Sequence, residues 1–307
     1  MLLIYTDKNS NRLQYTLKTI FREILGIEYR HTVLKDDFLK YQGPKLNYSA
    51  KSFSQEVFFC SYDLLYERGI GNFEVNLIDF EGTKALFPVN DEKSYLPFDV
   101  FSASFYLLSR YEEYLPYKKD EHGRFHAHES LAWKNKFLKK PVVNIWAYQI
   151  KRILKKRYPS LVFRRRTFSF IPTYDIDLAF SYRSKGFVRT TGGFINDLFQ
   201  RRFKDLILRS RVISGLQSDP FDTFSYQINL HKRYNLQAIY FILFANYSRY
   251  DKNISVSNKR FQHLVKHISD YAEVGIHPSY TSQNNMEMLQ KEVRKLSTVL
   301  KREVKVS

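Results

Sequence analysis

The sequence FSFIPTYDID occupies residues 168–177, near the middle of the chain. Its apolar run predicts a buried strand that ends in two carboxylates. Because side chains alternate between the two faces of a strand, Asp175 and Asp177 are expected on one face, at the carboxyl edge where α/β folds place their chemistry. Two anions this close favour a proton or a metal ion between them. The alternative is a solvated Asp-x-Asp turn, since short acidic pairs are common in loops.

Strands and helices alternate after this stretch. The predicted strands are residues 167–175, 238–244 and 274–277, and the predicted helices are residues 226–234, 257–271 and 286–300. Such alternation indicates a parallel sheet or a β/α-barrel. A further strand begins at residues 303–306, where the sequence stops. Since intact domains avoid an unpaired sheet edge, we expect the sequence to be a fragment that lacks a C-terminal part.

The residues before this stretch predict a separate domain. Strands are predicted at residues 2–6, 27–33, 72–80 and 84–89, and helices at residues 11–25, 98–115 and 141–158. A basic cluster between residues 151 and 166, interrupted by Pro159 and Ser160, marks the boundary. We therefore predict an α/β protein with a smaller α+β domain at residues 1–165 and an incomplete, distorted β/α-barrel domain at residues 166–307.

The composition excludes some classes of protein. Cys60 is the only cysteine, so an intramolecular disulfide is impossible and a disulfide-stapled secreted domain is excluded. Neither a signal peptide nor an uncharged apolar stretch of transmembrane length is visible, and we expect a cytoplasmic protein without a transmembrane segment. The net charge of +18 suggests a polyanionic neighbour, or else an ordinary lysine-rich surface.

A basic insertion separates the first two strands of the second domain. It spans residues 182–215, holds eight Lys or Arg and two Asp, and contains one predicted amphipathic helix at residues 194–213. Together with the cluster at residues 151–166, it is a candidate surface for nucleic acid or acidic membranes. No recognised nucleic-acid motif accompanies it, so we expect no specific nucleic-acid partner.

A histidine ends the third predicted strand of the second domain. If the strands are neighbours, His277 shares one rim with Asp175 and Asp177. Asp and His side chains are suitable ligands for a divalent metal, and a second Asp could then take a proton from water bound to that metal. The alternative for His277 alone is a strand-end histidine bonded to a backbone carbonyl.

Several of these residues resemble motifs of a known family. Thr-Tyr-Asp-Ile-Asp at residues 173–177 resembles the Thr-Phe-Asp-Asp-Asp signature of polysaccharide deacetylases, carbohydrate esterase family four. Glu-Val-Gly-Ile-His-Pro-Ser-Tyr at residues 273–280 resembles their second motif. Residues 219–224 and 246–253 are similar to segments between these motifs in one branch of the family, and residues 104–125 are similar to the uncharacterised N-terminal domain of that branch.

The resemblance implies an activity and a role for each site residue. It implies metal-assisted hydrolysis of N-acetyl or O-acetyl groups on a glycan, with Asp175 as the general base. Asp177 and His277 would bind a divalent metal, with Zn as the first choice and Co, Ni or Mg as alternatives. Ile176 stands where the family has its middle Asp, and Thr281 stands where it has a second ligand histidine. The general acid and the oxyanion residues would lie beyond Ser307.

Two other functions stay open from the sequence. Ile176 and Thr281 favour a relative that has lost catalysis and acts as a glycan-binding or scaffold protein. The basic clusters favour a module that binds nucleic acid or membranes. The sequence does not indicate the sugar or the oligomeric state.

Overall fold

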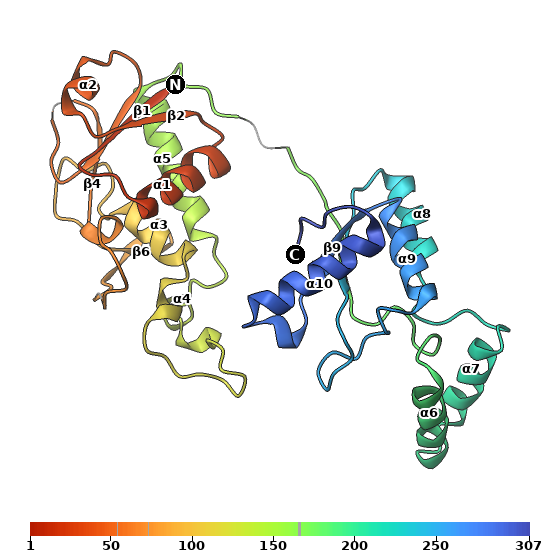
Figure 1. Ribbon diagram of the computed structural model, residues 1–307. Helices are drawn as coiled ribbons and strands as arrows, with labels where there is room; N and C mark the ends of the chain where they lie inside the picture. Colours follow the sequence, from red (N-terminus) through yellow and green to blue (C-terminus); the bar gives the residue numbers. More distant parts are fainter. Residues whose placement is uncertain (54, 73, 165–166) are drawn as a thin grey trace. The chain divides into compact units, whose positions relative to one another are not determined.

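The computed structural model describes residues 1–53, 55–72, 74–164 and 167–307. The chain forms two compact units, Met1–Thr167 and Phe168–Ser307, and each is described by itself. Residues 165 and 166, where the sequence places the boundary between the domains, lie outside the described residues. Figure 1 gives the positions of the elements along the chain.

A four-stranded sheet forms the centre of the first unit. Its strands are β1 (Leu2–Thr6), β2 (Tyr29–Thr32), β3 (Lys45–Ser49) and β4 (Val57–Cys60), in the order β2-β1-β3-β4. All three pairings are parallel. The sequence did not predict β3, because two of its buried positions are polar. The Asn47 amide donates to the Glu56 carboxylate at 2.9 Å, and the Ser49 hydroxyl donates to Asn47 at 2.6 Å.

Helices join and cover these strands. The helical elements of the unit are α1 (Asn11–Leu17), continued by a π-helical segment (Lys18–Ile24), then α2 (Lys35–Lys40), α3 (Val100–Leu108), α4 (Leu131–Lys134) and α5 (Val142–Arg157), with short 3-10 turns at Asp63–Leu65, Tyr111–Tyr114 and Ala127–Glu129. The helix α3 is shorter than the helix predicted at residues 98–115. It ends at Leu108, because Arg110 adopts a left-handed conformation (φ 53°).

An antiparallel hairpin completes the first unit. It consists of β5 (Leu77–Phe80) and β6 (Thr83–Leu86), joined through Glu81 and Gly82, which both have positive φ. Phe73, which the sequence placed in the first of these strands, lies outside the described residues. The expected α+β domain needs correction, since strands and helices alternate through β3 and the main sheet is parallel, as in an α/β fold.

One buried carboxylate joins three parts of this unit. Asp99 caps α3 by accepting the N–H groups of Phe101 at 3.0 Å and Ser102 at 2.9 Å. Its second oxygen accepts the Tyr48 hydroxyl of β3 at 2.8 Å and the Tyr62 N–H at 2.5 Å. Burial raises the pKa of Asp99, although the bonds from Ser102, Tyr62 and Tyr48 oppose that shift.

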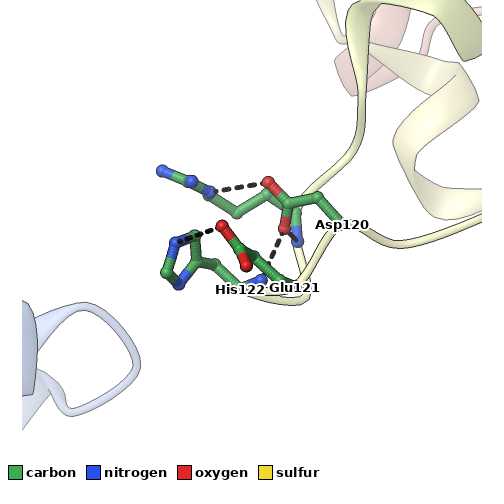
Figure 2. A network of polar contacts seen from close by, with 4 residues as sticks. Asp120, Glu121 and His122 are labelled. Carbon is green, nitrogen blue, oxygen red and sulfur yellow. Dashed lines mark hydrogen bonds and ion pairs between the residues drawn. The ribbon is translucent and has the colours of Figure 1, made fainter.

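The polar loop at residues 117–128 is closed by its own hydrogen bonds. The Asp120 carboxylate accepts the N–H groups of His122 and Arg124, each at 2.8 Å, and the Arg124 guanidinium at 3.1 Å. Figure 2 shows this network together with the contact of 3.5 Å between Glu121 and the His122 ring. The N–H of Arg124 is the main reason that the pKa of Asp120 is lowered.

The second unit is built on three parallel strands in sequence order. These are β7 (Thr173–Ile176), β8 (Ile239–Leu243) and β9 (Glu273–His277), ordered β7-β8-β9. The helices are α6 (Phe187–Phe199), α7 (Phe203–Ile213), α8 (Phe224–Tyr234), α9 (Lys259–Ser269) and α10 (Met286–Leu300), with a 3-10 turn at Tyr280–Ser282. The protein is thus a mixed α/β protein with parallel sheets and helices.

One face of this sheet packs against helices to form the core of the second unit. Side chains from alternate positions of the strands share that core with side chains of the helices: Tyr240, Ile242, Val274 and Ile276 from β8 and β9, Phe224 from α8, Phe261, Val265 and Ile268 from α9, and Leu296 from α10. The other face presents Asp175 of β7 and Phe241 of β8, and Asp175 is exposed. The helices α6 and α7 lie apart from these layers (Figure 1).

The first strand of the second unit is shorter than the sequence predicts. Residues 167–172 are not part of β7, and Phe168 is 93% exposed. Apolar residues predicted a buried strand here, but they have no core to enter. Pro172 contributes only its carbonyl, which accepts the Ile239 N–H at 3.0 Å.

Two further predictions for the second unit differ from the structure. The single helix expected at residues 194–213 is two helices, α6 and α7, because Arg201 turns left-handed (φ 55°) between them. Residues 303–306 form no assigned strand, but the Val306 carbonyl accepts the Ile276 N–H at 2.9 Å beside β9. None of the helices in the described ranges is long and apolar enough to cross a bilayer.

We predict that Asp99→Ala lowers the free energy of unfolding by about 3 kcal/mol, because the change removes a helix cap and leaves the buried Tyr48 hydroxyl without its acceptor. Urea denaturation measures this loss. Glu92→Ala is the matched control, since it removes an exposed carboxylate of the same unit and should leave the midpoint unchanged. Equal effects of the two substitutions would contradict the role given to Asp99.

Candidate functional site

Asp177 and His277 lie together at the carboxyl ends of β7 and β9. The His277 Nε2 atom is 3.7 Å from the Asp177 Oδ1 atom. The Asp177 side chain is 68% exposed and the His277 side chain 35% exposed. Both groups are therefore open to a ligand, and they lie on the face of the sheet that the helices leave uncovered.

The register of the sheet explains how residues 100 positions apart meet. Ile176 pairs with Ile242, and the next residue of β8, Leu243, pairs with His277. Asp177 directly follows Ile176 and so enters the same row across the sheet. Leu243 lies between Asp177 and His277 in this row, and it is buried.

A hydrogen bond selects the tautomer of His277. Its Nδ1 atom is 3.1 Å from the carbonyl oxygen of Pro278. Because a carbonyl can only accept, Nδ1 carries the hydrogen, and in the neutral ring Nε2 keeps a free lone pair. A histidine that donates one ring N–H to a backbone carbonyl presents its other nitrogen in the way that metal-binding histidines do.

A cavity of about 510 Å³ opens beside the pair. Its lining includes Asp177, Leu243, His277 and two stacked tyrosines, Tyr250 and Tyr280, whose ring centroids are 4.2 Å apart. Both tyrosines are exposed. The cavity thus combines two metal-ligating groups with an aromatic wall.

Two buried carboxylates hold the loops that form the rim of this cavity. Asp251 accepts the Ser248 hydroxyl at 2.9 Å and the Tyr280 N–H at 2.9 Å, which joins the loop after β8 to the loop after β9. Glu292 of α10 accepts the Ser279 hydroxyl at 2.6 Å. These acids are already engaged in the rim and support it.

A third buried carboxylate fixes the loop that follows β7. Asp219 accepts the N–H groups of Ser181 at 2.7 Å, Tyr182 at 2.8 Å and Arg183 at 3.0 Å, and that of Phe221 at 3.1 Å. Burial opposes ionisation of Asp219, but the four N–H groups outweigh it, and the pKa is lowered. Asp219 therefore holds the chain just beyond Asp177.

Asp175 occupies a neighbouring position. It is exposed and lines a second cavity of about 480 Å³, together with Asp177, Phe221 and Gln227. Asp177 borders both cavities. All three residues expected at the site are thus on one face of the sheet, with Asp177 and His277 in contact and Asp175 two positions before Asp177 on the same strand.

Thr281 stands at the position where the resembling family has its second ligand histidine. The Thr281 hydroxyl is 3.0 Å from the Ser279 hydroxyl, inside the turn after β9. Within residues 1–53, 55–72, 74–164 and 167–307, no group of three or more His, Cys, Asp or Glu is placed to hold a metal ion. Asp177 and His277 fit a divalent metal by their chemistry and tautomer, as two ligands.

Sequence reasoning did not assign the three supporting acids. Asp219 and Asp251 lie in the segments at residues 219–224 and 246–253, which were noted only for their similarity to a family. An Asp followed by Pro, or by Lys and Asn, is a signal for a turn whose N–H groups the carboxylate accepts. Glu292 lies within a helix, where the sequence carries no such signal.

Comparison with known proteins identifies one family model. Residues 2–159, just over half of the chain, match the model of a family described as a family of unknown function (DUF7033). No curated protein and no solved structure matches the chain.

We predict that the neutral His277 ring carries its hydrogen on Nδ1. The ¹⁵N chemical shifts of the neutral ring distinguish a protonated Nδ1 from a protonated Nε2. A ring protonated on Nε2 would mean that the bond to Pro278 does not select the tautomer, and that the nitrogen facing Asp177 is not free to bind a metal.

We predict that Asp219→Asn lowers the free energy of unfolding of the second unit by about 1–3 kcal/mol, because the amide cannot accept all four N–H groups. The folded-state pKa of Asp219 is lowered, so its stabilisation is complete above the unfolded value of about 3.9 and is lost as the pH falls through the folded-state value. Urea denaturation from neutral to acid pH should therefore show the two proteins converging in acid. A constant difference would contradict this.

Proposed function

The chain belongs to the DUF7033 family, whose function is unknown, and we propose that its second unit makes it a metal-dependent hydrolase. The proposed reaction removes N-acetyl or O-acetyl groups from a glycan. The observation that carries the proposal is the contact of 3.7 Å between Asp177 and His277 at the carboxyl ends of parallel strands. The resemblance of residues 173–177 and 273–280 to polysaccharide deacetylase motifs agrees with it.

The arrangement of the sheet supports an incomplete β/α-barrel as the setting of this activity. The strands follow in the order β7-β8-β9, and the helices α8, α9 and α10 share one core with one face. In a doubly wound sheet, helices cover both faces, whereas in a β/α-barrel they cover the outside only. The uncovered face with Asp175, Asp177 and His277 then corresponds to the inside of the barrel, and its carboxyl end is where barrel enzymes place their active sites.

The metal site follows from the side chains that meet there. Asp177 and His277 would hold a divalent cation, with Zn proposed first and Co, Ni or Mg as alternatives. When bound, this cation would supply a Lewis acid for the carbonyl oxygen of the acetyl group. Asp177 offers an exposed carboxylate, and His277 offers the nitrogen that its bond to Pro278 leaves unprotonated.

Asp175 is proposed as the general base. It lies on the same face as Asp177, two residues away, and is exposed to water. Its carboxylate would take a proton from the water that attacks the acetyl carbonyl. The departing sugar amine or hydroxyl must receive a proton in turn, and we assign no residue of the described chain to that role.

The aromatic wall of the cavity supports a sugar as the substrate. Tyr250 and Tyr280 are stacked and exposed, so they present amphipathic rings against which the apolar face of a sugar can pack while their hydroxyls stay in water. The lone Cys60 needs no oxidising compartment, and we place the proposed activity in the cytoplasm.

A glycan-binding relative without catalysis is the second candidate function. The observation that favours it is the engagement of Thr281 with Ser279, at the position where the resembling family has a second ligand histidine. The aromatic wall would serve binding equally well. This candidate predicts affinity for acetylated oligosaccharides without release of acetate.

We predict that Asp177→Ala and His277→Ala each abolish the binding of zinc by the protein, because each removes one of two ligands. Metal content after equilibration with zinc, measured by mass spectrometry, tests this. Glu273→Gln is the matched control: Glu273 is exposed at the opposite end of β9, on the same face, and its loss should leave zinc binding unchanged. Full zinc content in both site variants would refute the metal site.

We predict that Asp175→Asn keeps zinc but lowers the rate of acetate release from acetylated oligosaccharides by a factor of about 10²–10⁴, as expected for loss of a general base. Acetate release by the wild-type protein is measured alongside. Binding of the sugar without any release of acetate by the wild-type protein would favour the second candidate. Unchanged release by Asp175→Asn would remove Asp175 from the reaction.

A further inference from the structure

The helices α6 and α7 carry large apolar side chains that face water. On α6 these are Phe187, Val188, Ile195, Leu198 and Phe199, and on α7 they are Phe203, Ile207 and Ile213. At 100° per residue, the five side chains of α6 fall within about 120° of its circumference. Phe187 and Phe199 are each 84% exposed. Monomeric soluble proteins rarely leave such a stripe uncovered.

Contacts on the opposite side of α6 hold the two helices together. The Arg209 guanidinium of α7 donates to the Asp197 carboxylate at 2.9 and 2.7 Å, and both residues are buried. Gly193 makes room for this contact, since a Cβ atom there would collide with the guanidinium. Asp197 and Gly193 face α7, so the apolar stripe is directed away from the partner helix.

The turn between the helices is a fixed structure. Arg202 N–H donates to the Asp197 carbonyl at 2.8 Å, and Arg201 N–H donates to the Leu198 carbonyl at 3.0 Å. This is the Schellman pattern, with Arg201 at the left-handed position that glycine usually occupies. The tip therefore presents Phe199, Arg201, Arg202, Phe203 and Lys204 in a defined order.

The cations around the apolar stripe are free to bind another molecule. Arg201, Arg202, Lys204 and Arg211 are exposed, and none of them forms an ion pair within the described ranges of the chain. The hairpin thus combines exposed Phe, Leu and Ile side chains with flanking cations. This is the pattern of helices that lie in the interface of an anionic membrane, where apolar groups enter the acyl boundary and cations contact phosphates.

We propose that the α6–α7 hairpin docks on the surface of an anionic lipid bilayer, with Phe199 and Phe203 inserted at its tip. A nucleic acid would satisfy the cations but would leave the apolar stripe in water. A second copy of this chain, which has a net charge of +18, would bring like charges within a screening length of about 8 Å. An anionic bilayer satisfies both features at once, and it needs no shape complementarity.

Docking would also position the rest of the second unit. The Arg189 guanidinium of α6 donates to the Asn253 carbonyl at 3.0 Å and lies 4.4 Å from the centre of the Tyr247 ring. These residues belong to the same loop as Tyr250, which lines the cavity at Asp177 and His277. A hairpin bound to a bilayer would hold that cavity close to the membrane surface. The docking itself does not depend on the proposed hydrolase activity.

The test is cosedimentation of the protein with vesicles. Vesicles of equal parts phosphatidylglycerol and phosphatidylcholine should bind the protein, and vesicles of phosphatidylcholine alone should bind it far more weakly. Phe199→Ser and Phe203→Ser should each lower the partition coefficient about tenfold. Arg201→Gly keeps the left-handed turn but removes one cation, and should lower it about fivefold. Tyr226→Ser on α8 removes a comparably exposed ring outside the hairpin and should have no effect.

A second measurement reports on insertion directly. Phe199→Trp should show a blue-shifted tryptophan emission when anionic vesicles are added, compared with the wild-type protein and its two native tryptophans. The proposal is overturned if neither kind of vesicle binds, if both bind equally, or if the serine variants bind like the wild type. Self-association lost in the serine variants would instead make the stripe an interface between copies, and binding to duplex DNA retained by those variants would identify a nucleic-acid surface.

Discussion

The hydrogen-bonded register of β7, β8 and β9 is the constraint on which the candidate site depends. Because Leu243 pairs with His277 and Asp177 follows the last pair of β7, two residues 100 positions apart enter one row of the sheet. The helices α8, α9 and α10 draw the alternate side chains into a core. The polar side chains are therefore left on the open face, and a slip of one residue would reverse this arrangement.

Buried carboxylates perform the same task in both units. Asp99 in the first unit, and Asp219, Asp251 and Glu292 in the second, accept N–H or hydroxyl groups from segments distant in the sequence. Each one fixes a loop or a helix start, where the backbone has no partner in a strand or helix of its own. In the second unit, Asp219, Asp251 and Glu292 hold the loops around Asp177 and His277 in place, and Asp251 also lines the cavity beside them.

Three segments show which elements the sequence predicted correctly and which it did not. The helix α10 has the predicted bounds, because its apolar residues recur with a helical period on one face. The strand β3 was missed because Asn47 and Ser49 are buried polar residues that find partners only in the folded chain. Residues 167–172 were wrongly included in a strand, because Phe168 and Phe170 are apolar but exposed.

Local periodicity in the sequence was enough to predict the α/β alternation of the second unit, the common face of Asp175 and Asp177, and the strand end at His277. The approach of Asp177 and His277 to 3.7 Å, and the exposure of the stripe on α6, are properties of the folded chain alone. The physical reason is that pairing between strands, and the choice of which apolar face is buried, depend on contacts between distant segments. Those contacts form only when the chain is folded.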